Sequence, residues 1–201
     1  MKLSDFVHVF TDALPHYTCE YLLKSFEFAE RDAALRRVIL QRDGKVTVSF
    51  SELNLMESPH VPAMIRKELI AITKRYAEEY RHRCGVREHH WPEHFGMEHF
   101  RMKRYAPAGE CFSDHVDVLD YHSARRFVSF LFYLNTPDGG GETIFPTIPP
   151  SMCDAEQSRP LTITPKQGML MMFPPLWMFP HEGRPTTFNP KYILSGYLHY
   201  L

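Results

Sequence analysis

Hydrophobic positions recur with a helical period in two stretches of the first hundred residues. One runs over about His16 to Arg37 and the other over about Ala63 to Arg83, and each carries apolar side chains along one face. Two shorter segments, Phe6–Phe10 and Lys45–Phe50, are predicted strands, and the turn signal Asp43-Gly44 precedes the second of them. The N-terminal part is therefore predicted to hold two amphipathic helices and a few supporting strands.

The pattern changes at about Met97, where short apolar runs alternate with breaks that contain proline and glycine. Short strands separated by turns are typical of a β-sandwich or jelly roll. The predicted strands are Glu98–Tyr105, Ser113–Val118, Arg126–Leu134, Glu142–Phe145, Leu161–Thr164, Met169–Phe173, Met178–His181 and Lys191–Tyr200. We therefore expect a mainly β fold with flanking α-helices, as one domain over residues 1–201, in which residues 1–96 supply the helices and supporting strands and residues 97–201 form the core.

Composition excludes several classes of protein. Among the 201 residues, 44% are hydrophobic and 13% aromatic, which excludes general disorder. A net charge of −1 argues against a broad nucleic-acid footprint, because such a footprint needs a basic patch. The longest apolar run, Met169 to Pro180, is too short and too rich in proline to span a membrane.

Cysteine usage and the N-terminus favour a cytoplasmic setting. The four cysteines are scattered and form no CxxC pair, so neither a disulfide framework nor a zinc knuckle is expected. The first residues, Met1 to Phe6, lack a long apolar segment, so no signal peptide is predicted. We expect a cytoplasmic protein that binds neither nucleic acid nor a membrane, and the sequence leaves its oligomeric state open.

The placement of two of the 12 histidines suggests a metal site. His115 and Asp117 lie two residues apart in a predicted strand, so their side chains would point to the same face. His181 follows a long apolar strand and loop, where a polar imidazole needs an explanation. Two histidines and one carboxylate leave three positions of an octahedron open, which is the facial triad of non-haem Fe(II) oxygenases.

A lysine ten residues after His181 adds a second kind of binding group. Lys191 begins the last predicted strand, where Ile193, Ser195 and Tyr197 would share its face. An ammonium group at the rim of a barrel, with a hydroxyl four residues along the strand, could hold a carboxylate. An oxo-acid that chelates iron and carries a distant carboxylate would fit this arrangement.

Four sequence blocks occur in order between about Arg104 and Tyr197. They are Arg104-Tyr105 with Gly109, Phe112, His115 and Asp117; Arg126 to Asn135 in the pattern R-x-x-S-x-L-x-Y-L-N; Gly140-Gly141-Glu142-Thr143-Ile144-Phe145; and Pro165 to Gly168 with Phe173, His181 and Lys191. Together the blocks resemble the 2-oxoglutarate- and Fe(II)-dependent dioxygenases, in particular the prolyl 4-hydroxylase-like branch. The resemblance covers nearly half of the chain.

The resemblance implies both a fold and an activity. The core would be a double-stranded β-helix of the jelly-roll or cupin-like type. The protein would be a hydroxylase that acts on an unactivated C–H bond with Fe(II), 2-oxoglutarate and O2, releasing succinate and CO2, with ascorbate as a helper in vitro. His115, Asp117 and His181 would bind Fe(II), and Lys191 would pair with the C5 carboxylate of 2-oxoglutarate.

Further site residues follow from the resemblance with alternatives left open. Tyr105 and Tyr133 match positions whose phenols contact the cosubstrate, and Ser195 would join them, although each could serve packing alone. Trp177 is either core packing or a wall of the substrate site. Arg125 is either solvated or meets an acidic group of the substrate.

The identity of the substrate does not follow from the sequence. A free amino acid, a peptidyl residue or a small metabolite all fit, and the lack of an evident peptide-recognition annex favours a small molecule. The loops expected to select it are Ser49–Glu57, Val86–Gly96, Leu119–Arg125 and Thr147–Arg159.

Two other classes of function remain open at this stage. A cupin-like metalloenzyme could use the same three ligands without 2-oxoglutarate, and a non-catalytic jelly roll could serve as a binding module. Lys191 favours a 2-oxoglutarate-dependent hydroxylase over the cupin-like metalloenzyme, because only a dicarboxylic cosubstrate needs a fixed cation. The histidines between His89 and His99 could form a second metal site, but a polar loop explains them better.

Overall fold

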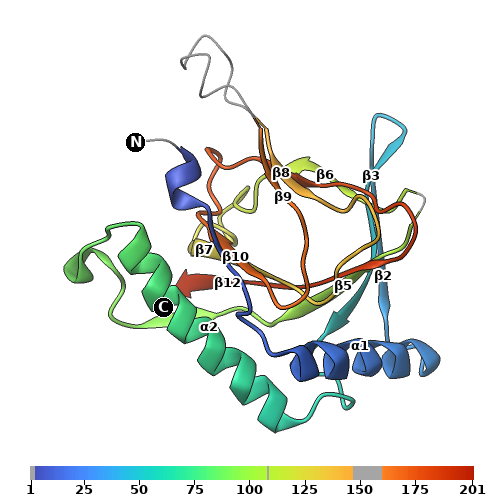
Figure 1. Ribbon diagram of the computed structural model, residues 1–201. Coiled ribbons are helices and arrows are strands. Elements are labelled where there is room, and N and C mark those ends of the chain that lie inside the picture. Colours follow the sequence, from blue (N-terminus) through green and yellow to red (C-terminus); the bar gives the residue numbers. More distant parts are fainter. Residues whose placement is uncertain (1–2, 108, 147–159) are drawn as a thin grey trace.

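The computed structural model describes residues 3–107, 109–146 and 160–201. The predicted substrate loop Thr147–Arg159 lies outside these ranges. Within them, the chain folds into one curled antiparallel sheet with two α-helices against its outer face (Figure 1). No helix in this part of the chain has the length and apolar character needed to cross a membrane.

The sheet contains 12 strands, ten of which follow the order β1-β10-β7-β12-β5-β3-β6-β11-β8-β9, while β2 pairs with β3 and β4 pairs with β12. The strand bounds are β1 His8–Phe10, β2 Arg36–Arg42, β3 Lys45–Asn54, β4 Phe95–Met97, β5 Arg101–Tyr105, β6 Phe112–His115, β7 Arg126–Tyr133, β8 Thr143–Phe145, β9 Leu161–Ile163, β10 Leu170–Phe173, β11 His181–Gly183 and β12 Lys191–Tyr200. The expected mainly β fold is confirmed.

The curl brings strands β6, β8 and β11 across from strands β5, β7, β10 and β12, which leaves a barrel interior between them (Figure 1). Strands β7, β10 and β12 are mostly buried on both faces, because they lie between the core under the helices and the core inside the barrel, and their side chains alternate between the two. On β12, Leu194 and Leu198 join the core under the helices, whereas Ile193 joins the core inside the barrel. On β10, Met172 and Met171 divide in the same way, so a continuous apolar run serves two cores.

The helices α1, His16–Arg31, and α2, Ala63–Arg83, cover the outer face of the sheet around β7, β10 and β12. Phe26 of α1 and Leu69 of α2 are fully buried in the core beneath them. Two short 3-10 helices, η1 Leu3–Phe6 and η2 Glu88–His90, complete the helical content of the described residues. The second predicted helix has the bounds that the sequence indicates.

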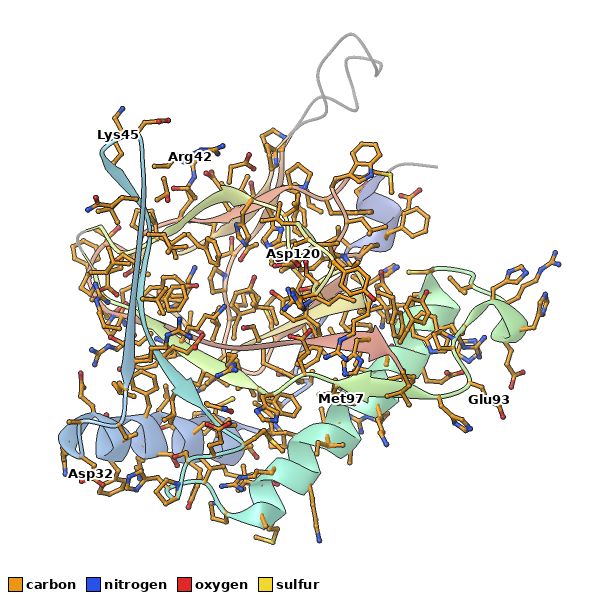
Figure 2. The ribbon with its side chains drawn as sticks, turned by 180° about the vertical axis from the view of Figure 1, so that it is seen from behind. Asp32, Arg42, Lys45, Glu93, Met97 and Asp120 are labelled. Carbon is orange, nitrogen blue, oxygen red and sulfur yellow. The ribbon has the colours of Figure 1, made fainter. Side chains whose placement is uncertain are left out.

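The first predicted helix is shorter than expected, which is a correction. It ends at Arg31, Ala33 takes a left-handed conformation with φ of 55°, and residues 36–42 form strand β2 instead. The reason lies in pairing: β2 and β3 form a hairpin across the Asp43-Gly44 turn, and the β-branched pair Val38-Ile39 suits a strand. Figure 2 shows Arg42 and Lys45 at the tip of this hairpin, away from the helix end at Asp32.

Three further expectations about local structure need correction. The segment Ser49–Asn54 is no loop, because it belongs to β3 and pairs with β2 and β5. Strand β6 ends at His115, so the predicted strand Ser113–Val118 is too long. The prediction for Met178–His181 is displaced, since strand β11 begins only at His181.

Strands from both parts of the chain form the one sheet. β1 pairs with β10, and β3 pairs with β5 and β6, so residues before 97 complete the barrel that the later strands begin. The cysteines in the described ranges, Cys19, Cys84 and Cys111, are free thiols.

Candidate metal centre

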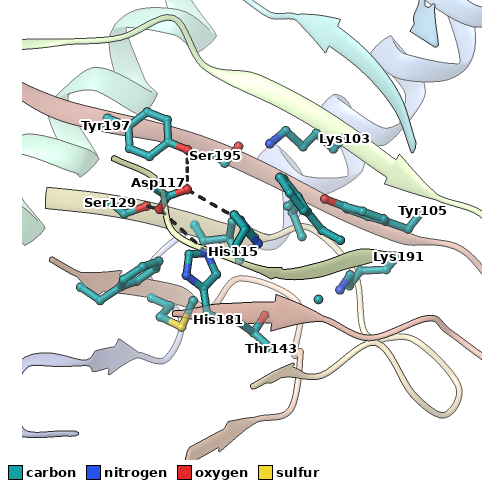
Figure 3. A pocket seen from close by; sticks show the side chains of 16 residues that line it. Lys103, Tyr105, His115, Asp117, Ser129, Thr143, His181, Lys191, Ser195 and Tyr197 are labelled. Atoms are coloured by element: carbon teal, nitrogen blue, oxygen red, sulfur yellow. Dashed lines mark hydrogen bonds and ion pairs between the residues drawn. The ribbon is translucent and has the colours of Figure 1, made fainter. Parts of the chain in front are cut away.

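A small cavity of about 50 Å³ lies inside the barrel (Figure 3). Strands from both sides of the curl line it, and its apolar walls include Leu131, Met171 and Phe173. The polar residues of the lining are Lys103, Tyr105, His115, Asp117, Ser129, Thr143, His181, Lys191, Ser195 and Tyr197. Most polar groups thus converge on one point in an otherwise apolar interior, which is typical of a binding site.

His115, Asp117 and His181 offer three ligand atoms that all lie within 4.8 Å of one another. The Nε2 atoms of both histidines lie 3.8 Å from the carboxylate of Asp117, one from each oxygen. Two atoms that each lie ~2.1 Å from one ion can be at most ~4.2 Å apart, so these pairs fit a shared metal. Among the residues that the structure describes, no other such group of three occurs.

Strand pairing positions the two imidazoles. His181 opens β11 directly opposite His115 at the end of β6, although 66 residues separate them in sequence. His115 and Asp117 were expected on one face of a single strand, and this is wrong for Asp117, which lies in a bend beyond the end of β6. The three residues therefore meet at the edge where two short strands end.

Backbone carbonyls determine which nitrogen of each imidazole faces the cavity. Nδ1 of His115 donates to the Ser113 oxygen at 2.9 Å, and Nδ1 of His181 donates to the Phe179 oxygen at 3.1 Å. Because a carbonyl oxygen only accepts, the proton of each neutral ring resides on Nδ1 and the lone pair on Nε2. That tautomer is the one that a metal ligand requires.

Electrostatics keeps His115 in the neutral form. Burial and the neighbouring His181 lower the pKa of His115 to about 4, against the opposing attraction of Asp117. Its ring also stacks on Phe112, with centroids 3.6 Å apart and planes 4° from parallel. The imidazole is therefore held in place without a proton on Nε2 at neutral pH.

Two hydroxyl groups hold the carboxylate of Asp117. The Tyr197 phenol donates to Oδ1 at 2.8 Å and the Ser129 hydroxyl donates to Oδ2 at 3.0 Å (Figure 3). Burial, together with the nearby charge of Asp117, raises the pKa of Tyr197 well above its ordinary value, so the phenol stays a donor. The orientation of this carboxylate is therefore fixed before any ion arrives.

Arg126 supports this arrangement from behind. Its guanidinium forms a two-pronged ion pair with Glu98 at 2.8 and 2.9 Å and donates to the backbone oxygen of Asp117 at 2.8 Å. It also lies over the ring of Tyr197, 3.8 Å from the centroid. One side chain thus restrains both the backbone of Asp117 and the tyrosine that holds its carboxylate.

Lys191 lies in the same cavity and is only 2% exposed. Its Nζ donates to the Gly141 oxygen at 2.9 Å and lies 4.9 Å from the ring centroid of Tyr105. Burial lowers the pKa of Lys191 to about 8, although the charge of Glu142 acts in the opposite direction. A buried ammonium group with one neutral acceptor remains able to bind an anion.

Gly141 explains part of the G-G-E-T block. Its φ of 78° favours glycine, and an added Cβ would lie 2.9 Å from a Thr186 methyl group and 3.3 Å from the Lys191 side chain. Glycine at this position therefore lets the backbone carbonyl approach the ammonium group of Lys191.

The other residues expected at the site fall into two groups. Tyr105 and Ser195 line the cavity, in register with Lys191 and Arg101 respectively. Tyr133 is fully buried, is not among the lining residues, and donates its hydroxyl to Thr143, which does line the cavity.

Arg125 and Trp177 do not line this cavity. Arg125 belongs instead to a second, wider and polar cavity of about 620 Å³, which shares Asp117 with the first. Trp177 is 76% exposed, so it is not packed in the core.

The sequence did not single out four polar groups of the cavity, namely Lys103, Ser129, Thr143 and Tyr197. For Tyr197 the signal was present, because it shares a strand face with Lys191 and Ser195. Lys103 lies two residues before Tyr105 on β5 and so has the same facing. Whether this face of β5 lies towards a cavity depends on the neighbouring strands, and these are defined only by the order of the sheet.

Comparison with known proteins supports the same conclusion. Residues 100–199, about half of the chain, match the model of the 2OG-Fe(II) oxygenase superfamily. No curated protein sequence matches the chain.

Solved structures with the same fold include three prolyl hydroxylases. That of the viral collagen prolyl hydroxylase from Paramecium Bursaria Chlorella virus-1, as its 2OG complex, has a TM-score of 0.65 at 17% identity and covers 98% of this chain and 96% of its own. The Trichoplax adhaerens enzyme, in complex with a peptide fragment of the hypoxia inducible factor oxygen degradation domain, gives 0.70 at 16% identity, covering 98% and 84%. A Pseudomonas putida prolyl-4-hydroxylase gives 0.65 at 17% identity, covering 97% and 92%.

At identities this low, the structural similarity establishes only the double-stranded β-helix fold. The match to the family model identifies the chemistry. That chemistry depends on Fe(II), 2-oxoglutarate and O2. The three possible metal ligands His115, Asp117 and His181, and the buried Lys191 in the same cavity, agree with this requirement. The chain belongs to the 2OG-Fe(II) oxygenase superfamily, as a 2-oxoglutarate-dependent non-haem iron dioxygenase, and it shares its fold with the prolyl hydroxylases.

Proposed function

We propose that this protein hydroxylates an unactivated C–H bond of an amino acid, a peptidyl residue or a small metabolite, with succinate and CO2 as co-products. In this proposal His115, Asp117 and His181 bind Fe(II), and Lys191 binds the distant carboxylate of 2-oxoglutarate. The observation that carries it is the presence of three ligand atoms within 4.8 Å of one another in the cavity that also contains the Lys191 ammonium group.

The residues of the chain would prepare the site in distinct ways. When bound, iron and the keto acid supply the oxidising power that amino-acid side chains lack. The carbonyls of Ser113 and Phe179 accept hydrogen bonds from the Nδ1 atoms and so orient both Nε2 atoms towards the cavity, while Tyr197 and Ser129 keep the carboxylate aimed at the same point. Such supporting contacts raise ligand basicity and reduce the freedom lost on metal binding.

Lys191 would bind one end of the cosubstrate. Its single neutral partner, the Gly141 oxygen, leaves N–H donors of the ammonium group for a carboxylate. Tyr105 and Thr143 line the cavity beside it and could add hydroxyl donors, while Tyr133 would act indirectly by orienting the Thr143 hydroxyl. Ascorbate would help in vitro by keeping the metal reduced.

The apolar wall would exclude water from the reacting groups. Leu131, Met171 and Phe173 line the cavity, and the rings of Phe173 and Phe145 contact His181 with centroids 4.8 and 5.5 Å away. A low-dielectric interior strengthens the ionic contacts of Lys191 and Asp117 and limits access to the oxidant.

Succinate formation from 2-oxoglutarate with Fe(II) and ascorbate tests this proposal. Asp117→Ala should remove the only anionic ligand of the three and reduce succinate to background, together with the loss of Fe(II) binding measured by calorimetry. The matched control is Lys166→Met, an exposed residue outside the cavity, which should behave as wild type. Wild-type turnover by Asp117→Ala, or a wild type that binds neither Fe(II) nor 2-oxoglutarate, would show the proposal to be wrong.

A further inference from the structure

Lys103 places a second ammonium group in the cavity, and the proposed roles do not use it. It lies on β5 between Arg101 and Tyr105 and lines the cavity with the latter. No hydrogen bond or ion pair joins its Nζ to any residue in the described ranges. Its neighbours there are ring faces, with the centroid of Phe50 at 5.0 Å and that of Phe112 at 5.7 Å.

The nearest carboxylates are engaged elsewhere. Glu52 lies opposite Lys103 in the β3–β5 register, but its Oε1 lies within 4.0 Å of two arginines, Arg36 and Arg101. Asp117 accepts from Tyr197 and faces the two histidines. Lys103 is half-buried, and aromatic faces compensate an ammonium group only partly, so its partial removal from water without an anion costs free energy.

The two lysines of the cavity occupy different places. In the register of the sheet, Lys191 lies beside Tyr105, whereas Lys103 lies beside Ile193 and one step closer to Ser195. Figure 3 shows the Lys103 ammonium group on the side of Ser195 and Tyr197, with Tyr105 between it and Lys191. A single short dicarboxylate held by Lys191 therefore leaves the Lys103 side for another molecule.

The wider cavity gives that other molecule a route. It has a volume of about 620 Å³, is more open than the first, and shares Asp117 with it. Arg101 lines it and has the same facing on β5 as Lys103, so two cationic side chains follow one strand face from the wide cavity towards the candidate metal centre. Such a row favours an incoming anion.

From this arrangement we propose that Lys103 binds a carboxylate of the hydroxylated substrate, so that the enzyme acts on a carboxylic acid rather than on a neutral molecule. This inference rests on the function proposed above. The acid group would lie beside Ser195 and Tyr197, and the carbon to be hydroxylated would lie between it and the metal. Lys103 is then a specificity-determining residue that contacts the substrate.

Paramagnetic relaxation can test this without knowledge of the natural substrate. The enzyme is loaded with Mn(II) and N-oxalylglycine, an unreactive analogue of 2-oxoglutarate, which fills the Lys191 side. Acetate, propionate and L-proline are then each compared with the corresponding amide, and the Mn(II)-induced relaxation of their protons is measured. The variants are Lys103→Met and Lys103→Gln, with Lys166→Met as the exposed control.

We expect the acids to be relaxed more strongly than the amides in wild type and in the Lys166 control. Loss of one charge-assisted hydrogen bond should weaken acid binding roughly ten- to a hundredfold in the Lys103 variants and abolish the preference over amides. Retained binding of N-oxalylglycine shows that the cavity of each variant is intact, and the glutamine variant replaces the methionine one if the latter fails to fold.

Other outcomes overturn the inference. Equal relaxation by acid and amide in wild type, no relaxation by any acid, or an acid preference that survives in the Lys103 variants would each do so. If the Lys103 variants lose N-oxalylglycine binding instead, the carboxylate at Lys103 belongs to the cosubstrate. Failure of wild type to bind Mn(II) and N-oxalylglycine would refute the proposed function itself, which is a separate and recognisable result.

Discussion

Replacement of Lys191 by methionine should separate binding from stability. Burial lowers the pKa of Lys191 from 10.5 to about 8, a difference of about 2.5 units. At 1.36 kcal/mol per unit, keeping this ammonium group charged in the folded protein at neutral pH costs about 3 kcal/mol. Methionine removes that cost but leaves the Gly141 oxygen without its donor, which costs roughly 1–3 kcal/mol.

The two effects of Lys191→Met nearly cancel, so its free energy of unfolding at pH 7 should equal that of wild type or exceed it by up to about 2 kcal/mol. Binding of 2-oxoglutarate should nevertheless be lost, because the carboxylate would enter a buried site without its cation. Urea denaturation and anaerobic titration of the Fe(II)–2-oxoglutarate charge-transfer absorption measure the two quantities separately. Unchanged 2-oxoglutarate affinity would refute the role given to Lys191.

The pH dependence of the stability difference between wild type and Lys191→Met tests whether burial lowers the pKa of Lys191. Between about pH 8 and 10.5 the unfolded chain holds a proton on Lys191 that the folded chain has released, so wild type should gain stability relative to Lys191→Met as pH rises through this window. Over the same interval the affinity of wild type for 2-oxoglutarate should fall, because the free protein loses the ammonium group. A stability difference that stays flat from pH 7 to 10 would contradict the argument.

Three further substitutions give distinct expected outcomes. Tyr197→Phe removes a hydrogen bond to Asp117 and should weaken Co(II) or Fe(II) binding about 10- to 100-fold in a metal titration, and unchanged affinity would count against a supporting role. Gly141→Ala forces a side chain into a left-handed conformation beside Lys191, so denaturation should show a loss of roughly 1–3 kcal/mol and 2-oxoglutarate should bind more weakly. Ala33→Gly should relieve the left-handed strain after α1 and raise the melting temperature by about 2–4 °C, whereas a lower value would show that this conformation carries no strain.

The hydrophobic pattern along the sequence predicted those elements whose conformation depends mainly on residues close by in the chain. The 3.6-residue period of Ala63–Arg83 and the apolar run Lys191–Tyr200 predicted their elements to the residue. For the end of the first helix and the strand that follows it, local pattern failed, because residues 36–42 become a strand only through their pairing with β3. A strand is stabilised by pairing with a distant segment, which the local sequence does not contain.

The composition of the candidate site could be predicted further than its geometry. Spacing and motif order singled out His115, Asp117, His181 and Lys191 as residues of one site. Only tertiary structure decided that His181 pairs with His115 across β6 and β11, and that Asp117 is oriented from outside the strand by Tyr197.

The same distinction explains why Lys103 escaped the sequence analysis. The shared strand face with Tyr105 is the one local signal for Lys103, and it does not separate a cavity-lining lysine from a solvated one, because the surroundings of Lys103 come from neighbouring strands whose order in the sheet is not a local property. Burial and charge at a site are sums over distant segments. They become defined only when the sheet curls and encloses the space between its strands.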